Sequence, residues 1–342
     1  MDNNTLVEVK NLKKHFPIRK GVFKRVVGHV KAVDGVSFTI RKGETLGVVG
    51  ESGCGKTTTG RCVIRLTEVT EGSIVYNIGD REVDIANLSP RELKAARREF
   101  QIIFQDPYSS LDPRKIVGDI ILDPIRVHQN LSKAEQQELL LETAQKVGLK
   151  AEHMNRYPHE FSGGQRQRIG IARALILRPE LIVCDEPVSA LDVSVQAQIL
   201  NLLSRLQEEF KLTYLFVAHD LSVISHISDR VMVMYLGKVA EIASAERIYT
   251  EPKHPYTEAL LSSIAAPGAK RKRKVLAGDV PDPSKPPPGC VFHTRCPYAQ
   301  DICRTKIPEL RRLDPSTDDQ VACHFAEELE LQGFERQLPK TG

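Results

Sequence analysis

Short apolar segments and longer amphipathic segments alternate along the first two thirds of the chain. The apolar segments are Leu46–Gly50, Leu181–Cys184, Thr213–Ala218 and Val231–Tyr235. Runs of this length, bounded by polar residues or glycine, predict buried strands. Because helical patterns separate these strands, the sequence predicts an α/β fold with a mostly parallel sheet.

Residues 90–180 have mainly helical patterns. Ser89–Glu92 and Ser132–Glu135 each place a serine three positions before a glutamate, which is the pattern of a capping box at a helix N-terminus. The second box is expected to precede a helix over Gln136–Val147, and Gly148 is expected to end it. We therefore expect a helical subdomain at about residues 90–180, inserted into the α/β core.

The composition changes after about residue 250, where prolines become frequent. Pro281–Pro288 is so rich in proline that it predicts an extended spacer instead of a helix or a central strand. Four of the seven cysteines follow this spacer. We expect one domain over residues 1–255 and a distinct spacer and cysteine-rich region over residues 256–342.

Composition and charge narrow the function only a little. With 41% hydrophobic and 27% charged residues the chain resembles an ordinary globular protein, and its net charge of +4 is too small to indicate nucleic-acid binding. The basic segments Arg19–Lys31 and Lys270–Lys274 are expected to be solvated loops or linkers, with attraction to anionic phospholipid headgroups as the alternative.

No segment approaches the roughly 18 to 20 apolar residues of a membrane helix, and the N-terminus does not resemble a signal peptide. We therefore expect a cytosolic chain that meets a membrane only as a peripheral partner.

A glycine-rich pattern, G-x-x-x-x-G-K-[ST], lies at Gly50–Thr57, between a predicted strand and a helix near Thr57–Leu66. Its glycines allow backbone N–H groups to surround phosphate oxygens, and the helix adds its positive N-terminal end. We expect Lys56 to reach the β and γ phosphates of a nucleotide and the Thr57 hydroxyl to bind Mg²⁺. The other expected binding residues of this phosphate loop are Gly50, Ser52, Gly53, Cys54, Gly55 and Thr58.

A pair of acidic residues ends the second predicted strand. Asp185 and Glu186 lie at its carboxyl end, which is the edge where ligands bind in α/β sheets. A buried acidic pair without a cation would be costly, so the pattern favours a functional site. We expect Asp185 to bind Mg²⁺ and Glu186 to polarise the attacking water.

A third motif, Phe161-Ser-Gly-Gly-Gln165, precedes this acidic strand. It resembles the signature sequence of the ABC ATPases, usually Leu-Ser-Gly-Gly-Gln, with Phe161 in place of leucine. The resemblance implies an ABC-type P-loop ATPase fold, with ATP and Mg²⁺ as ligands. It also implies that Ser162, Gly163, Gly164 and Gln165 contact the ATP held by a second ATPase subunit.

The remaining matches occur in the order of the family. Gln105 resembles the Q-loop glutamine, which binds near Mg²⁺ and the γ-phosphate and touches the membrane subunit. Asp192 resembles the D-loop aspartate at the dimer interface, and His219 the switch histidine that contacts the γ-phosphate. Phe16 resembles the aromatic residue that stacks on adenine. The resemblance thus implies four catalytic residues, which are Lys56, Gln105, Glu186 and His219.

The cysteine-rich region resembles the C-terminal extension of oligopeptide/dipeptide-type ABC importer ATPases. Its cysteines are Cys290, Cys296, Cys303 and Cys323. Four thiolates can hold a [4Fe–4S] cluster or zinc. The third alternative is that the four cysteines are reduced thiols that hold no metal. The resemblance favours the [4Fe–4S] cluster. His293 and His324 are minor alternatives as ligands.

The resemblance also implies partners and a location. It implies a second, similar but non-identical ATPase subunit, two membrane permease subunits and, indirectly, a substrate-binding protein, at the cytoplasmic face of the inner membrane. The implied function is ATP-driven import of di- or oligopeptides, with nickel or oligosaccharide import as alternatives. A soluble ABC ATPase acting on nucleic acid is the rival class, but such proteins usually carry two ATPase units or a coiled-coil insert, so no nucleic-acid partner is expected.

Overall fold

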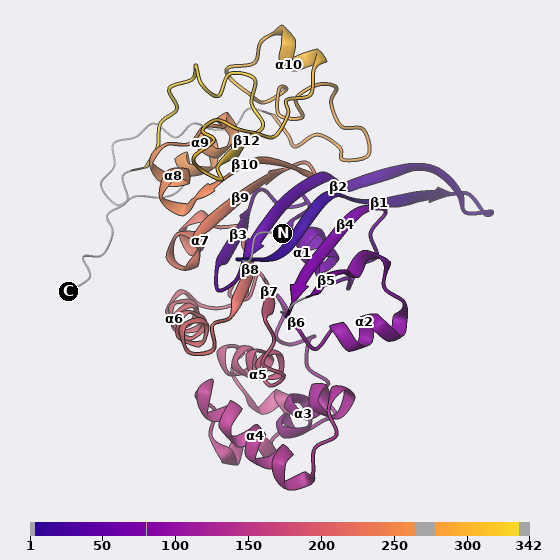
Figure 1. Ribbon diagram of the computed structural model, residues 1–342, viewed down its shortest axis with the longest axis vertical. Helices are drawn as coiled ribbons and strands as arrows, with labels where there is room; N and C mark the ends of the chain where they lie inside the picture. Colours follow the sequence, from indigo (N-terminus) through magenta and orange to yellow (C-terminus); the bar gives the residue numbers. More distant parts are fainter. Residues whose placement is uncertain (1–3, 80, 264–277, 335–342) are drawn as a thin grey trace.

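The computed structural model describes residues 4–79, 81–263 and 278–334. The basic run at residues 270–274, which was expected to be a solvated linker, lies outside these ranges. Figure 1 shows a helical part at one end of the molecule, two sheets in the middle and the C-terminal region at the other end. In the described part of the chain, every helix is too short or too polar to cross a membrane.

A parallel sheet lies at the centre of the fold. Its strands are β3 (Thr45–Val49), β6 (Phe100–Ile103), β7 (Leu181–Asp185), β8 (Thr213–Val217) and β9 (Arg230–Tyr235). They lie in the order β9-β3-β8-β7-β6, and each runs parallel to its neighbours. The prediction of an α/β fold with a mostly parallel sheet is confirmed.

Both faces of this sheet are buried, which explains the continuous apolar runs in its strands. Val183 and Leu215 belong to the hydrophobic core on one face, while their neighbours Cys184 and Phe216 belong to the core on the other. The first core also takes side chains from helix α1 (Lys56–Val63), and the second from α6 (Val193–Phe210) and α7 (Leu221–Ile227).

A second, antiparallel sheet packs beside the first and corrects one expectation. Its strands are β1 (Thr5–Lys20), β2 (Arg25–Arg41), β4 (Glu71–Ile78) and β5 (Arg81–Asp84). Residues 19–31, expected to be a loop, belong to a long hairpin in which Lys20 pairs with Arg25, and Figure 1 shows it projecting from the body. The charges of this segment indicated a loop, but its valines favour a strand.

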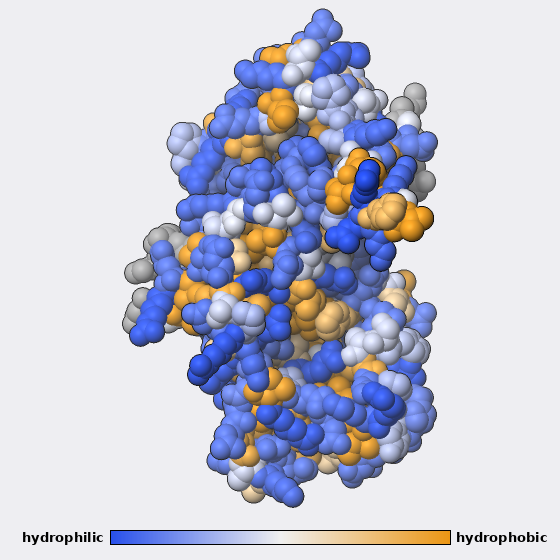
Figure 2. All heavy atoms as spheres, turned by 90° about the vertical axis from the view of Figure 1, so that its right-hand side faces the viewer, coloured by the Kyte–Doolittle hydropathy of each residue, from blue (hydrophilic) through white to orange (hydrophobic). Residues whose placement is uncertain are grey.

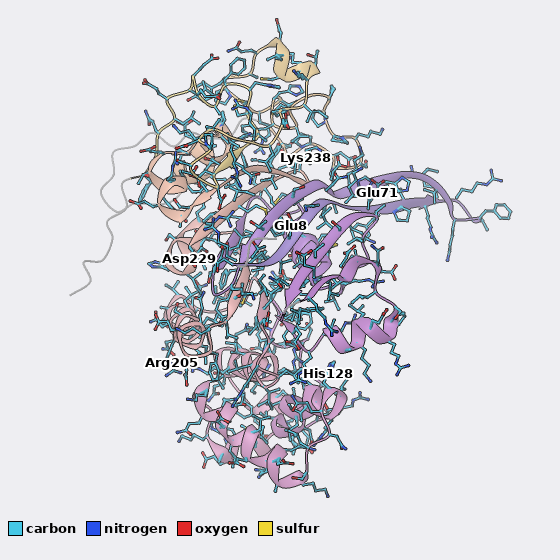
Figure 3. The ribbon with its side chains drawn as sticks, viewed as in Figure 1. Glu8, Glu71, His128, Arg205, Asp229 and Lys238 are labelled. Atoms are coloured by element: carbon cyan, nitrogen blue, oxygen red, sulfur yellow. The ribbon has the colours of Figure 1, made fainter. Side chains whose placement is uncertain are left out.

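The Lys13 ammonium pairs with Glu71 on β4 at 2.6 Å, and Figure 3 shows Glu71 near the base of this hairpin.

The helical part forms as predicted, with one exception. Both capping boxes are present, at the starts of α2 (Pro90–Ala96) and α4 (Lys133–Lys146). The exception is β6, which lies within residues 90–180 but belongs to the central sheet. The other elements of this part are α3 (Val117–His128), α5 (Gly163–Leu175) and the short 3₁₀ helices Ala151–Asn155 and Pro158–Glu160, while a further 3₁₀ helix, Ile85–Asn87, follows β5 before this part begins.

The part of the chain that follows β9 extends the central sheet. Strand β10 (Lys238–Ser244) pairs antiparallel with β9, and β12 (Gln320–Val321) pairs with β10 and with β11 (Arg311–Arg312). The helices after β10 are α8 (Ala245–Thr250), α9 (Pro255–Ser262) and α10 (Asp301–Thr305). Residues 281–288 contain neither helix nor strand, as the prolines predict.

Candidate nucleotide-binding and catalytic site

The predicted phosphate loop joins β3 to α1 at the carboxyl edge of the sheet. Gly53 and Gly55 have φ angles of 78° and 104°, a region that favours glycine. A side chain at Gly55 would stand 2.1 Å from the carbonyl oxygen of Ala32, so only glycine fits there. Ser52 and Gly53 are exposed at the tip of the loop, whereas Cys54 is buried beneath it.

Lys56 is held inside this loop. Its ammonium donates to the carbonyl oxygens of Gly50 at 2.7 Å and Glu51 at 3.1 Å, and its side chain is buried. Thr58, on the first turn of α1, is partly exposed. The loop therefore places one cation against its own backbone at the helix N-terminus, an arrangement that suits a phosphate group.

Asp185 lies next to α1 and brings two of the predicted metal ligands together. Its Oδ1 accepts from the Thr57 hydroxyl at 2.8 Å, and its Oδ2 lies 3.3 Å from the Arg61 guanidinium. Asp185 is almost wholly buried, so these partners supply the compensation that a buried carboxylate needs. A hydroxyl and a carboxylate side by side are oxygen donors of the kind that Mg²⁺ prefers.

Glu186 brings together residues from three strand ends. Its Oε2 accepts from the Gln105 amide at 3.1 Å and lies 3.2 Å from Nδ1 of His219. Gln105 follows β6, Glu186 follows β7 and His219 follows β8. The three predicted catalytic side chains outside the phosphate loop thus meet at one carboxylate.

The backbone of Glu186 has a left-handed conformation, with φ of 47°. Its N–H donates to Val217 O at 3.0 Å, and its carbonyl oxygen accepts from the backbone and the hydroxyl of Ser189 at 3.2 and 3.0 Å. Such a conformation costs on the order of 1 kcal/mol for a residue other than glycine. These hydrogen bonds hold it and turn the carboxylate toward Gln105 and His219.

The signature motif opens α5 as predicted. Ser162 caps the helix, since its hydroxyl accepts from Gln165 N at 3.4 Å and the Gln165 side chain accepts from Ser162 N at 3.0 Å. Ser162 is exposed. Among the described residues, no hydrogen bond or ion pair joins Ser162–Gln165 to the phosphate loop.

The two glycines of this motif pack against the start of α6. A side chain at Gly164 would stand 2.5 Å from Cγ1 of Val195, and one at Gly163 would stand 3.3 Å from Leu191. Asp192, the predicted D-loop residue, is the exposed N-cap of α6. The signature and D-loop residues therefore share one surface within the chain.

Phe16, predicted to stack on adenine, lies on β1 opposite Val30. Its ring is 40% exposed, and the Lys14 ammonium lies 4.9 Å from the ring centroid. An exposed aromatic face of this kind is available for stacking on a base.

The four C-terminal cysteines are neighbours with free thiols. Cys290 N donates to Cys303 O at 2.8 Å. Burial first, and then the nearby thiols, raise the pKa of Cys296 to about 12 and that of Cys323 to about 11. A raised pKa opposes the thiolate form, so a bound cation would be needed to stabilise these two thiols as thiolates.

The described residues contain no group of three or more cysteine, histidine or acidic side chains placed to hold a metal ion. The four thiols are therefore not arranged as a ligand set. The alternative ligands contact backbone instead: His293 Nδ1 lies 2.8 Å from Cys290 O and His324 Nε2 lies 2.9 Å from Lys306 O.

Sequence reasoning missed two arginines at the site. Arg61 follows Thr57 by four positions, so helical spacing places both on one face of α1, and this signal was available. Arg295 pairs with Glu51 of the phosphate loop from 244 residues away, and no sequence pattern relates the two.

The comparisons with known families agree with these features. Residues 33–189 match the family model "ABC transporter", and residues 240–303 match "Oligopeptide/dipeptide transporter, C-terminal region". Among solved structures, the dimeric ATP-binding cassette MJ0796 bound to ADP and phosphate has a TM-score of 0.61 and 29% identity, covering 70% of this chain and 99% of its own.

Two curated relatives cover nearly the whole chain. The oligopeptide transport ATP-binding protein AppF of Bacillus subtilis is 56% identical over 95% of this chain and 98% of its own length. A putative peptide import ATP-binding protein of Brucella ovis is 50% identical over 92% and 96%. On this similarity, together with the phosphate loop and acidic strand described above, the chain belongs to the ABC transporter ATPases, in the group of oligopeptide/dipeptide ATP-binding proteins.

Proposed function

We propose that this ABC ATPase powers the import of di- or oligopeptides through membrane permease subunits. The observation that carries the proposal is the meeting of Gln105, Glu186 and His219 beside the Asp185–Thr57 pair, at the end of the phosphate loop. The names of the relatives supply the peptide cargo. No feature of the described residues favours nickel, oligosaccharide or nucleic acid.

In this proposal the phosphate loop and α1 bind the ATP phosphates, with Lys56 on the β and γ groups, while Phe16 stacks on adenine. Thr57, Asp185 and Gln105 hold Mg²⁺, which neutralises charge on the phosphates when bound. Glu186 orients the attacking water, and His219 contacts the γ-phosphate. The hydrogen bonds of Glu186 hold it in place before the reaction, so that catalysis is mainly positioning and charge stabilisation.

We also propose that each ATP lies between two subunits. Support comes from Ser162, which is exposed at a helix N-terminus and makes no bond to the phosphate loop of its own chain. A helix N-terminus of this kind favours the phosphates of a facing nucleotide. The second subunit is a similar but non-identical ATPase, and the pair acts with two permease subunits and a substrate-binding protein.

The four cysteines are proposed to hold a [4Fe–4S] cluster, with zinc as the alternative. Support comes from the donor set, four mutually close thiols in one region, and not from their present arrangement. The cluster would hold together a region with little hydrophobic core of its own. We place the boundary between the ATPase domain, residues 1–255, and this region, residues 256–342, at the start of α9.

We propose a peripheral location at the cytoplasmic face of the inner membrane. Support comes from the hairpin of β1 and β2, on which every charged side chain between Glu8 and Asp34 is basic. At its tip Val22 and Phe23 are 95% and 86% exposed. Figure 2 views the molecule from the side on which the hairpin projects, and apolar and polar surface lie side by side there. Exposed apolar side chains flanked by basic ones favour an anionic bilayer surface.

Glu186→Gln is expected to keep ATP binding and to lower ATP turnover by about 100-fold or more, because the amide cannot polarise water. The matched control is Glu142→Gln, which removes an exposed glutamate paired with Arg178 on the helical part. Phosphate release and nucleotide affinity are measured on both. Full turnover by Glu186→Gln would refute the assigned role.

Protein purified without oxygen is expected to contain iron and acid-labile sulfide, and Cys303→Ser to lose both. The same substitution at Cys62, a buried thiol of α1, is the control. Zinc in place of iron would support the alternative, and protein without either metal would contradict the proposal.

At low salt the protein is expected to float with vesicles that contain phosphatidylglycerol, but not with vesicles of phosphatidylcholine alone. Lys24→Gln with Arg25→Gln is expected to weaken this binding on the order of tenfold, whereas Arg91→Gln with Lys94→Gln on α2 leaves it unchanged. Equal binding to neutral vesicles, or binding to DNA instead, would contradict this use of the hairpin.

A further inference from the structure

The C-terminal region contacts the phosphate loop directly. The Arg295 guanidinium makes two bonds to the Glu51 carboxylate, Nη1 to Oε2 at 2.6 Å and Nη2 to Oε1 at 3.1 Å. Nη1 also lies 3.4 Å from the hydroxyl of Tyr235. The Arg295 side chain is 6% exposed. A two-bonded pair with a buried guanidinium fixes geometry better than an exposed ion pair does.

A second contact holds the backbone of the same residue. Glu51 N donates to the Tyr256 hydroxyl on α9 at 2.8 Å. The ring of Tyr256 packs with Tyr235 and Phe292 at centroid distances of 4.7 and 5.3 Å, and Tyr235 with Phe292 at 5.1 Å. All three rings are buried. Aromatic packing therefore positions both groups that reach Glu51.

Glu51 in turn contacts the cation of the loop. Its carbonyl oxygen accepts from Lys56 Nζ at 3.1 Å and from Cys54 N at 3.2 Å. A continuous series of contacts thus runs from Arg295 through Glu51 to Lys56. Movement of the C-terminal region would shift the carbonyl that holds the ammonium expected at the nucleotide phosphates.

We propose that Arg295 is a positioning residue for the phosphate loop, through which the C-terminal region sets the affinity of the ATPase for nucleotide. Because such coupling is reciprocal, nucleotide also stabilises the packing of the C-terminal region against the loop. This inference rests on the proposed function, in which residues 50–57 bind ATP.

The test compares ATP affinity and turnover in full-length variants. Arg295→Gln and Glu51→Gln are each expected to raise KM and Kd for ATP about tenfold with little change in kcat. Arg295→Lys keeps the positive charge but loses the two-bonded geometry. Its KM and Kd for ATP are therefore expected to lie between those of the original protein and those of Arg295→Gln. In the Glu51→Gln background, Arg295→Gln is expected to have no further effect on ATP affinity, because the contact is already lost.

The matched control is Arg311→Gln. Arg311 makes an equally two-bonded pair with Glu327, at 2.6 and 2.7 Å, within the C-terminal region and without contact to the loop. It is expected to leave KM unchanged. Metal content is measured in every variant, so that an effect on the adjacent cysteines is recognised.

Hydrogen exchange gives a readout that a merely structural role would not change. ATP is expected to slow exchange at residues 290–303 in the original protein but not in Arg295→Gln. An unchanged KM in Arg295→Gln and Arg295→Lys, while Lys56→Ala still abolishes ATP binding, would overturn this inference alone. Unchanged binding in Lys56→Ala would instead overturn the proposed function.

Discussion

The site depends on the parallel register of the central sheet. Ladder pairing sets Cys184 opposite Phe216 and Asp185 opposite Val217, while Val48 on β3 pairs with Val217 from the other side. Parallel strands bring all their carboxyl ends to one edge. The phosphate loop, the acidic pair, Gln105 and His219 meet for that reason, although more than 100 residues separate the first from the last. A sheet with one antiparallel strand among these would place one of the groups at the opposite edge.

Charge pairing then decides which arrangement at this edge is stable. Asp185 is buried and compensated by Thr57 and Arg61, and Lys56 is buried and compensated by backbone carbonyls. Each charged group within the loop and strand end therefore has a partner before a nucleotide binds. Binding would exchange these partners for phosphate and metal, at small cost in reorganisation.

The sequence predicted a feature best when one short segment contains all the residues that determine it. Apolar runs predicted four of the five parallel strands, two capping boxes predicted helix starts, and the motif at Gly50–Thr57 lies on the loop that it predicted. The hairpin was mistaken for a loop because its charges were weighed above its β-branched residues, and charges on a strand cost little when both faces meet solvent. The contact between Arg295 and Glu51 could not be predicted, since it depends on how two distant segments pack.

The same reasoning explains the cysteines. Their spacing indicated a shared site, and the structure places the four cysteines in one region, but neutral thiols, only one of them fully buried, gain nothing by pointing at a common centre. In the proposed cluster, the metal itself would be needed to arrange them as ligands. The sequence therefore does not predict the position of a side chain when a bound group or long-range packing sets that position.

The central claim, that one nucleotide is held between two subunits, is tested most directly by an experimental structure of the assembled transporter. The Glu186→Gln protein would be combined with its partner ATPase, the permease and MgATP. We expect the γ-phosphate to contact Lys56 of this chain and the signature helix of the facing ATPase, and Ser162 to face the partner's nucleotide. Nucleotide bound to Lys56 with Ser162 open to solvent in a closed, ATP-loaded assembly would contradict it.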